Sequence, residues 1–457
     1  MKVELPGVPP EVNVADVVTQ MIRRAASASF EDWWRRRVEE GGFCANPIHL
    51  TGGDGLGREH QVFTRCNNRR AIVCPSCSEL YARDTWQLIH AGLRGGHHDI
   101  PTTVVEHPQV FVTLTAPSFG AVHTIRASGS CHPPGNQRRQ CPHGRPLWCD
   151  RTHDHDEPAL GQPLCRDCYD YIGHVLFSWH APELWRRFTI QLRRFLSRQL
   201  RDRAENPRNT RVSFIRVVEL QRRGLPHFHA VTRLDAASEP GQPPSPPDTS
   251  ISASDFLALV RQAAIDIAIT VNGDKVLRFG EQLDMKIIRC ANTDESGNAG
   301  ISSRQIAAYL AKYVTKSVAD FGILARRFSP AAIDQLDVTE HVREIMRTIV
   351  TLAEPEPYEG MVSWVHTLGY RGHVISKTRQ FSTTMTALRE RRAAWRKEQM
   401  RDRAQAAIAS HESDAAMQWE FERLGHTNLG DRVLVLSAFA RARQQRITAR
   451  DALREGA

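Results

Sequence analysis

Hydrophobic and polar residues alternate in several short stretches of the chain, and this alternation predicts β-strands. The first stretch is VFVTLTAPS, from Val110 to Ser118. Two more, RVSFIRVVEL and PHFHAVTRL, are separated by a short turn around Gly224, so we expect them to pair as an antiparallel hairpin. A further strand-like segment lies near Met285–Arg289.

Helical periodicity dominates the remaining patterned segments, and the last hundred residues are expected to be mainly helical. The clearest predicted helices are Asn13 to about Glu40, Trp185–Arg203, Ser254–Ile269 and Ser303–Val318. No tandem repeat or coiled-coil heptad array is present. The pattern predicts an α+β fold in which an antiparallel sheet, built from about Pro108 to Ser317, is flanked by helices.

Composition narrows the class of protein. Of 457 residues, 41% are hydrophobic, which excludes a wholly disordered chain. No run approaches the ~20 apolar residues of a membrane span, and the N-terminus lacks a secretory signal, so we expect a cytoplasmic protein without a membrane partner. The net charge is +9, and Arg389–Arg403 holds seven basic and three acidic residues. This balance favours a nucleic-acid partner, although a solvated helix face would look the same.

Nine of the ten cysteines lie between Cys44 and Cys168, and two Cys-x-x-Cys pairs among them predict structural zinc. Two closed sites are the simplest count, and the two regions could pack as a single zinc-bearing module. The expected first site is Cys44, Cys66, Cys74 and Cys77, and the expected second site is Cys141, Cys149, Cys165 and Cys168, with Cys131, His143 and His153 as alternative ligands. Cys290 is expected to be a core cysteine.

His227 and His229 are alternate residues of a predicted strand, so both imidazoles project from one face and could bind one metal ion. In a hairpin centred on Gly224, Gln221 would face His227 and Glu219 would face His229, which supplies a third ligand. Two histidines of an ordinary core strand, or those of a metallohydrolase, would have the same spacing.

The segment AAYLAKYVTK places Tyr309, Lys312, Tyr313 and Lys316 at helical spacing, with both phenols on one face. A phenol has a pKa near 10, so a nucleophilic tyrosine needs nearby cations or a metal-polarised electrophile. The two lysines and the predicted metal could meet that need; half-buried core tyrosines beside solvated lysines are the alternative. The chain contains no phosphate-binding loop for ATP.

The segments FVTLTAPS, ELQRRGLPHFHAV and YLAKYVTK, in this order, resemble motifs one, two and three of HUH endonucleases, which initiate rolling-circle replication. More narrowly, the chain resembles replication initiator proteins of actinobacterial plasmids and integrative elements. This resemblance extends over CNNRRAIVCPSCSELYARDTWQL, HPQVFVTLTAPSFGAVHT, LGQPLCRDCYDYIGHVLF and HTLGYRGHVISKTRQFSTTMTALRERR. It implies an HUH-type antiparallel sheet flanked by helices.

The resemblance also implies a metal-dependent DNA nicking enzyme. His227 and His229 would help bind catalytic Mg²⁺ or Mn²⁺, with Glu219 or Gln221 completing the set. A motif-three tyrosine, Tyr313 by position, would attack the scissile phosphate and leave a 5′-phosphotyrosine link and a free 3′-hydroxyl that primes synthesis. The partners would be origin DNA, single-stranded or extruded from supercoiled duplex, and a host helicase with the replication machinery.

A departure from some relatives concerns Tyr309, which stands where they have a glutamate, as in members that use two tyrosines. Both a second strand transfer by Tyr309 and a water-mediated release therefore remain open. Lys312 and Lys316 would assist the phenols.

The expected domain division follows the motifs. It comprises a helical segment 1–40, a first Cys-rich zinc region 41–107, an HUH nuclease core 108–320 with a second Cys-rich insertion at about 121–170 and a Pro/Ser linker 236–250, and a basic helical accessory region 321–457. One alternative function is a zinc-containing DNA-binding regulator without catalysis, and another is an HUH transposase or relaxase. Convergence of the imidazoles and Tyr313 on one open site would favour the nicking enzyme over a regulator that only binds DNA.

Overall fold

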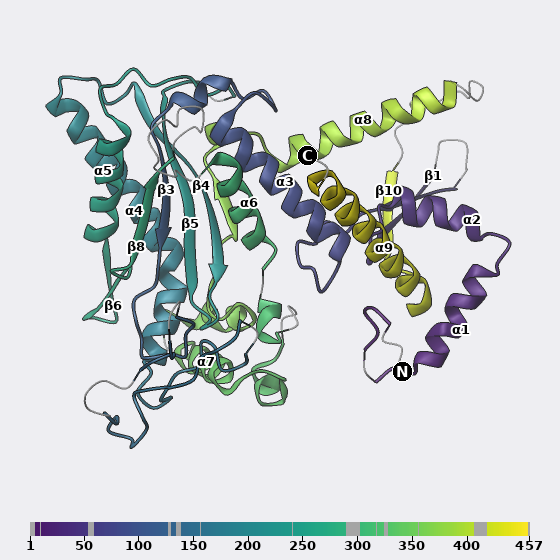
Figure 1. Cartoon of the computed structure of the whole chain (residues 1–457), viewed down its shortest axis with the longest axis horizontal. Helices are drawn as coiled ribbons and strands as arrows, with labels where there is room; N and C mark the ends of the chain where they lie inside the picture. The colour runs from purple at the N-terminus through teal and green to yellow at the C-terminus, as the bar shows by residue number, and fades with distance from the viewer. Residues whose placement is uncertain are drawn as a thin grey trace. The chain divides into compact units, whose positions relative to one another are not determined.

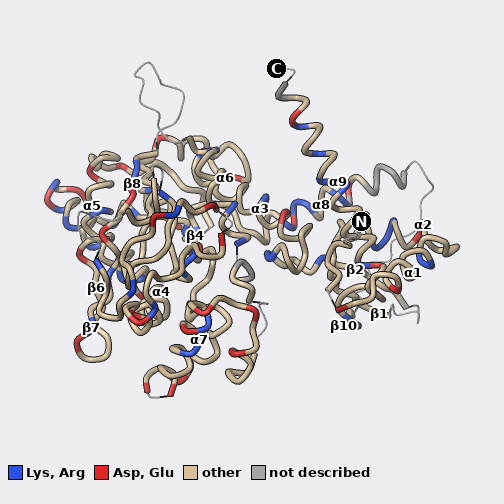
Figure 2. Tube along the Cα trace, turned by 60° about the horizontal axis from the view of Figure 1, so that its bottom comes forward, with Lys and Arg blue, Asp and Glu red and all other residues tan. Residues whose placement is uncertain are grey.

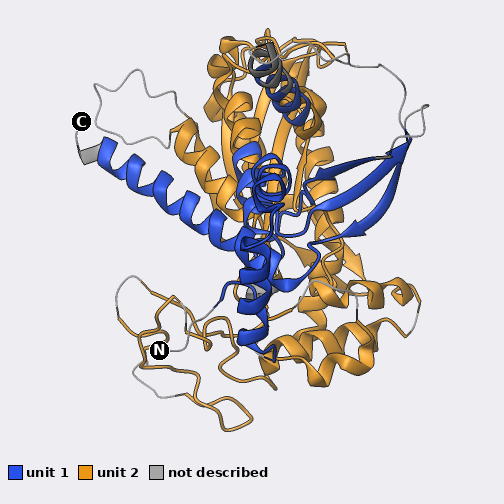
Figure 3. Cartoon of the chain, turned by 90° about the vertical axis from the view of Figure 1, so that its right-hand side faces the viewer, with its two compact units in different colours: residues 1–84, 388–457 blue, residues 85–387 orange. Residues whose placement is uncertain are grey.

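The computed structural model describes residues 5–9, 11–53, 59–126, 129–133, 139–155, 157–239, 241–288, 302–316, 318–323, 328–354, 356–405 and 418–455. Cys290 lies outside the described residues. The chain forms two compact units: unit 1 comprises residues 1–84 and 388–457, and unit 2 comprises residues 85–387 (Figure 3). Within the described ranges, no helix is both long and apolar enough to cross a membrane.

Unit 2 is built on a five-stranded antiparallel sheet with the strand order β8-β3-β5-β4-β9 (Figure 1). The bounds are β3 Gln109–Leu114, β4 Thr210–Leu220, β5 Pro226–Ala236, β8 Leu283–Ile287 and β9 Ile375–Lys377. The alternating segments of the sequence thus form the centre of the sheet. Together with the helices, the sheet confirms the predicted α+β class.

One face of this sheet is apolar and packs on two helices, α4 (Tyr171–Asp202) and α5 (Ala253–Asp266). Phe228 points to this face, and the ring of Trp185 on α4 stacks on it at 5.9 Å between centroids. The helices begin where their caps are: Asp170 accepts a hydrogen bond from Gly173 N, and Ser252 forms a capping box on α5. This core fixes the orientation of β5.

The opposite face of β5 carries His227 and His229, and further along it Arg233 and Asp235. Helix α6 (Ser303–Val314) packs on β4, and Ser302 with Gln305 forms the capping box that starts this helix. The second part of α3 (Pro75–Arg94) contributes the carbonyl of Gly92, to which the Arg233 guanidinium donates a hydrogen bond.

Asp235 is the centre of a buried ionic cluster on this face. Its carboxylate accepts hydrogen bonds from Arg233 Nε at 2.6 Å and Nη2 at 3.0 Å, and lies 2.8 Å from His107 Nδ1. Both the Arg233 and the Asp235 side chains are at most 1% exposed. Burial opposes ionisation of Asp235, but the hydrogen bonds from His107 and the charge of Arg233 outweigh it, so its pKa is lowered. The cluster braces the strand that bears the two histidines.

Replacing this carboxylate should therefore destabilise unit 2. We expect Asp235→Asn to lower the free energy of unfolding by roughly 3 to 5 kcal/mol, because it leaves the buried Arg233 charge uncompensated. The matched control is Asp334→Asn, whose carboxylate is 71% exposed and pairs with Arg347, and which should cost less than about 1 kcal/mol. Urea titration measures both, and equal losses would contradict the assigned role of the cluster.

The rest of unit 2 consists of short elements around the sheet. They are η2 Thr102–Glu106, β6 Ala268–Val271, β7 Lys275–Arg278, η3 Val318–Phe321, η4 Pro330–Gln335, α7 Glu340–Leu352, η5 Glu359–Thr367 and η6 Arg379–Phe381. Strands β6 and β7 form a separate two-stranded ribbon. Between Phe119 and Asp170 the described chain forms only turns and isolated bridges.

Unit 1 combines both ends of the chain. Its three-stranded sheet has the order β10-β1-β2, with β1 Ile48–Gly53, β2 Glu59–Thr64 and β10 Gln418–Leu424. Its helices are α1 Val14–Ala25, α2 Phe30–Trp33, the π-helix η1 Trp34–Glu40, the first part of α3, most of α8 Met385–Gln405, and α9 Leu429–Glu455. Arg24 on α1 forms a bidentate ion pair, at 2.8 and 2.9 Å, with the fully buried Asp431 on α9.

Several expected boundaries differ from the structure. The helix expected from Asn13 to Glu40 is broken between Ala25 and Phe30, and the helix expected to reach Val318 ends at Val314. The Pro/Ser segment 236–250 is tied to unit 2, because Ser250 N donates to Glu205 Oε1 at 2.9 Å. The expected accessory region 321–457 is split: residues 321–387 belong to unit 2 and residues 388–457 to unit 1.

Candidate functional site

The two histidines of β5 lie on the face of the sheet that α6 covers. In the observed register Glu219 is directly opposite His227, and Val217 is opposite His229. The register expected from a turn centred on Gly224 is therefore wrong by two residues. A shift of two preserves the face of every side chain, so the polar side chains still meet on one side.

The expected side-chain neighbours are nevertheless in contact, along the diagonals of the ladder. Glu219 Oε2 lies 3.5 Å from His229 Nε2, and Gln221 Nε2 lies 3.4 Å from His227 Nδ1. The imidazole rings of His227 and His229 are 4.5 Å apart between centroids. A carboxylate and two imidazoles thus share one small area of the sheet.

Helix α6 adds both tyrosines to this area. The ring of Tyr313 stacks on His229 at 5.0 Å, and the ring of Tyr309 meets the same imidazole edge-on at 5.0 Å. The two phenol rings are 4.7 Å apart. The predicted shared face of the two tyrosines is confirmed, and it is the face directed at the histidines.

The two lysines of the tyrosine segment have different surroundings. Lys316 donates a hydrogen bond to Glu219 Oε1 at 2.6 Å, and its Nζ lies 4.7 Å from the centroid of the Tyr313 ring. Lys312 is exposed, and among the described residues its ammonium group makes no hydrogen bond or ion pair. Lys316 is therefore the lysine placed to act on Tyr313 and Glu219.

Burial and charge perturb the titratable groups of the site. Burial, together with the neighbouring His229, lowers the pKa of His227 to about 3, so this imidazole is neutral at pH 7. Burial also raises the pKa of Glu219, but the attraction of His229 and the hydrogen bond and charge of Lys316 outweigh it and lower that pKa overall. Burial and a hydrogen bond with Tyr313 raise the pKa of Tyr309. Neutral imidazole and ionised carboxylate are the forms that bind metal.

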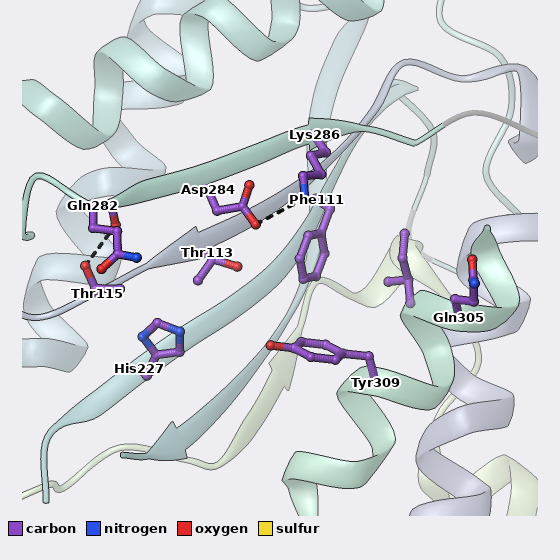
Figure 4. A pocket seen from close by; sticks show the side chains of 10 residues that line it. Phe111, Thr113, Thr115, His227, Gln282, Asp284, Lys286, Gln305 and Tyr309 are labelled. Atoms are coloured by element: carbon purple, nitrogen blue, oxygen red, sulfur yellow. Dashed lines mark hydrogen bonds and ion pairs between the residues drawn. The ribbon is translucent and has the colours of Figure 1, made fainter. Parts of the chain in front are cut away.

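An open cavity of about 490 Å³ adjoins these groups. Figure 4 shows the hydroxyl of Tyr309 directed toward His227 inside it. Its lining residues from the sheet and α6 are Phe111, Thr113, Thr115, His227, Gln282, Asp284, Lys286, Gln305, Ile306 and Tyr309. Only two of these residues, His227 and Tyr309, were candidate site residues from the sequence. The alternation in FVTLT and in QLDMK could have identified lining residues of β3 and β8, because it places alternate residues of these strands on the same face as the histidines.

His229 is oriented to present one nitrogen to a ligand. Its Nδ1 lies 3.3 Å from Thr113 Oγ1, while Nε2 is buried and has no hydrogen-bond partner in the part of the chain that the structure describes. A buried imidazole nitrogen without a hydrogen bond, beside a carboxylate, fits a metal ligand. Gln221 fits less well, because its Oε1 accepts a hydrogen bond from Arg223 Nε at 3.0 Å.

Three clusters of cysteine and histidine side chains could bind structural metal ions. In each cluster, all ligand atoms lie within 4.8 Å of one another. The clusters are Cys44, Cys66, Cys74 and Cys77; His123, Cys131, Cys149 and His153; and Cys141, His143, Cys165 and Cys168. Among the described residues, the two histidines of β5 belong to no cluster of this kind. The first cluster has the four cysteines that were expected together.

The expected second set is rearranged. The structure places Cys149 with Cys131, and His143 takes the expected place of Cys149 beside Cys141, Cys165 and Cys168. The first cluster lies in unit 1 and the other two lie in unit 2, so the cysteine regions do not form a single module.

Comparison with known proteins places the chain in a family. A family model described as "Replication initiator protein, pSAM2" (RepSA) matches residues 30–440. A replication initiator protein of Streptomyces ambofaciens is 37% identical over 461 residues, which cover 94% of this chain and 95% of that protein. No solved structure matches the chain. The chain therefore belongs to the RepSA family of plasmid replication initiator proteins.

Proposed function

We propose that this replication initiator acts in rolling-circle replication, as an HUH endonuclease that nicks one strand of origin DNA through a tyrosine. The observation that carries the proposal is the convergence of two imidazoles, the Glu219 carboxylate and two phenols beside one open cavity. Catalysis by a nucleophile requires such proximity, whereas a regulator that only binds DNA does not.

Tyr313 is the proposed nucleophile. Its oxygen attacks the scissile phosphorus, the phenolic proton leaves to water, and the bond from phosphorus to the 3′ oxygen breaks. The 3′ oxygen takes up a proton and becomes the free hydroxyl that primes synthesis, while the 5′ phosphate remains joined to Tyr313. One phosphodiester bond replaces another, so this step needs no ATP.

The neighbours of Tyr313 support this assignment over Tyr309. The Lys316 ammonium lies over the Tyr313 ring, where its charge can stabilise the negative charge that develops as the Tyr313 oxygen attacks the phosphate. The raised pKa of Tyr309 keeps that phenol protonated, so it can donate a hydrogen bond to the Tyr313 oxygen. Tyr309 remains available for a second strand transfer when the product is released.

The proposed catalytic ion is Mg²⁺ or Mn²⁺, held by His227, His229 and Glu219. When bound there, it would polarise the scissile phosphate and stabilise the charge that develops on it. Lys316, which pairs with Glu219, adds a positive charge at the same place. The sheet orients both imidazoles before DNA arrives.

Replacing one imidazole should separate binding from cleavage. We expect His229→Ala to lower the metal-dependent nicking rate by roughly 10²-fold or more, because it removes one ligand and the charge stabilisation that the ion provides. DNA affinity measured without divalent ions should change little. The matched control is His366→Ala in η5, which should nick at the wild-type rate. Full nicking activity of His229→Ala over a manganese titration would contradict the proposed ligand set.

The proposed structural ion of the first and third clusters is zinc, because thiolates and imidazoles are its preferred ligands. In the first cluster, Cys44 Sγ lies 3.8 Å from Cys74 Sγ and 3.7 Å from Cys77 Sγ. These separations match two thiolates on one tetrahedral zinc, which are ~3.8 Å apart for bonds of ~2.3 Å. In the third cluster, His143 Nδ1 lies 3.2 Å from Cys168 Sγ.

The proposed partners are origin DNA and a host helicase. Figure 2 shows basic and acidic positions mixed over both units, with Lys and Arg recurring along α8 and α9. With a net charge of +9, binding should weaken steeply as salt rises. The chain has no ATP-binding loop, so unwinding would depend on an enzyme supplied by the host.

The direct test incubates the protein with labelled single-stranded DNA that contains the origin of its own element, together with Mn²⁺ or Mg²⁺. Denaturing gels and mass spectrometry should then detect a 5′-linked adduct on Tyr313. Tight, salt-sensitive binding without an adduct would instead favour a DNA-binding regulator without catalysis.

A further inference from the structure

We propose that the middle cluster is a third zinc site, of the Cys₂His₂ type, and that its ion shapes a groove for the DNA strand beside the active site. The ligands are His123, Cys131, Cys149 and His153. They come from the segment between Phe119 and Asp170, which forms neither helix nor strand in its described part. The zinc site does not depend on the proposed nicking function, whereas the assignment of the groove to a DNA strand rests on it.

The ligand atoms lie about as close together as in a tetrahedral site, with the two imidazole nitrogens slightly closer. His123 Nδ1 and His153 Nε2 are 3.0 Å apart, and Cys149 Sγ lies 3.5 Å from His153 Nε2. Cys131 Sγ lies 3.8 Å from His123 Nδ1. Thiolate and imidazole ligands of one tetrahedral zinc are ~3.3 to 3.8 Å apart, given bonds of ~2.0 to 2.3 Å.

The groups behind the ligands also point to a metal. His153 is buried, and its Nδ1 lies 2.7 Å from Glu157 Oε2, so a proton on Nδ1 leaves the Nε2 lone pair facing the other ligands. Arg151 donates to the second oxygen of Glu157 at 2.6 Å and holds this carboxylate in place. Thr124 N donates to Cys131 Sγ at 3.2 Å and so helps to orient this sulfur.

The ion would cross-link stretches of this segment that backbone hydrogen bonds also join. Backbone hydrogen bonds close the base of the segment, from His123 N to Gln162 O at 2.8 Å and from Gly161 N to His123 O at 2.9 Å. A second pair joins His132 and Cys149. Among the described residues between Val122 and Gly161, the buried apolar side chains are Cys131, Cys141 and Leu160, so a metal cross-link would supply stability that so small a core cannot.

This loop is packed against the turn between β4 and β5, which directly precedes His227 and His229 on β5. Arg222 Nη2 donates to His155 O at 2.8 Å. Gly161 approaches the same turn so closely that a Cβ there would lie 2.5 Å from the carbonyl carbon of Arg222. The position of the zinc-bearing loop and that of the catalytic turn are therefore coupled.

Between the loop and the turn is a groove of about 550 Å³. His123 and Thr124 line it from the loop, and Gln221, Arg223 and Lys316 line it from the catalytic side. It continues the active site, because Lys316 and Gln221 also contact Glu219 and His227. The groove is lined by Arg222, Arg223 and Lys316, and Lys316 lies over the ring of the proposed nucleophile Tyr313, so the groove suits the phosphates of a single DNA strand on one side of the nick.

The first part of the test is zinc content, measured by mass spectrometry of the metal in purified full-length protein. Three clusters predict three zinc ions per chain, and Cys149→Ser should hold two. Glu157→Gln should keep the third ion but bind it about 10- to 100-fold more weakly. His132→Ala is the control: its imidazole lies 3.0 Å from Cys131 Sγ but outside the cluster, so three ions should remain. Unchanged zinc in Cys149→Ser would overturn the site.

The second part measures DNA affinity by fluorescence anisotropy without divalent ions. Two series of oligonucleotides extend from the nick site on the 5′ side or on the 3′ side. The two variants tested are Cys149→Ser and Glu157→Gln, the latter after its weakly bound ion has been removed. We expect both to bind DNA about tenfold more weakly in only one of the two series, a loss equivalent to one or two phosphate contacts. Equal losses in both series, or none, would overturn the groove assignment.

Neither measurement depends on cleavage. A protein that never forms an adduct would contradict the proposed nicking mechanism, while the zinc count and the binding series would still decide this inference.

Discussion

Tyr313→Phe should abolish the covalent link between the protein and origin DNA, with a loss of roughly 10⁴-fold or more in nicking rate. In the proposed mechanism the phenol oxygen itself forms the new bond, and the expected loss is large because phenylalanine offers no substitute for it. The ring remains, so its stacking on His229 and its contact with Lys316 should be kept. DNA binding in the absence of divalent ions should consequently stay close to that of the wild type.

The matched variant is Tyr309→Phe, four residues earlier on the same face of α6. We expect it to form the first adduct but to impair later transfer steps, which a suicide substrate followed by an acceptor strand can separate. Adduct formation by Tyr313→Phe would move the nucleophile to Tyr309. An adduct in the double variant would refute the tyrosine mechanism for both residues.

Cys74→Ser should unfold most of unit 1 while unit 2 stays folded. Structural zinc contributes about 10 to 16 kcal/mol in zinc-finger peptides, which is comparable to the whole stability of a typical domain, about 5 to 15 kcal/mol. Cys74 is fully buried, and the neighbouring Cys44 carbonyl also anchors His426 Nε2 at 2.9 Å. Loss of the ion would therefore release both ends of the chain that build the unit.

Hydrogen exchange with mass spectrometry can measure this change by segment. Amides of β1, β2 and β10 should lose protection in Cys74→Ser, whereas those of β3, β4 and β5 should keep it. The control is Ser29→Ala, since Ser29 makes no capping hydrogen bond to α2. Unchanged protection of unit 1 after verified zinc removal would count against a structural ion at this cluster.

The sequence predicts the central sheet well because the alternation of apolar and polar residues separates the strand face that packs on the core helices from the opposite face. β3, β4, β5 and β8 all fall on alternating segments. The sequence does not predict the register of the β4–β5 hairpin, because the conformation of the turn determines it. Leu220 pairs with Pro226, and Gly224 N bonds to Gln221 O within the five-residue loop. A pattern with a period of two cannot distinguish registers that differ by two.

The candidate site is predictable where a local pattern fixes it. Spacing alone brings together His227 with His229 on a strand, and Tyr309 with Tyr313 on a helix. In the expected second site, His143 replaces Cys149, and Cys149 belongs to a different cluster. This arrangement depends on how a long loop folds back, which cysteine spacing does not reveal. Contributions from β8, such as Asp284, depend on strand order, which only the tertiary structure determines.

The order of synthesis has a consequence for unit 1. Strand β1 lies between β2 and β10, but β10 begins at Gln418, more than 350 positions after β2 ends at Thr64. At ribosomal rates of about 5 to 20 residues per second, β10 emerges roughly 20 to 70 s after β2. For that interval β1 has an open edge that can pair with another nascent chain. The first-made part of the protein is thus the last to complete its fold, and its yield in a cell should depend on chaperones that shield this edge.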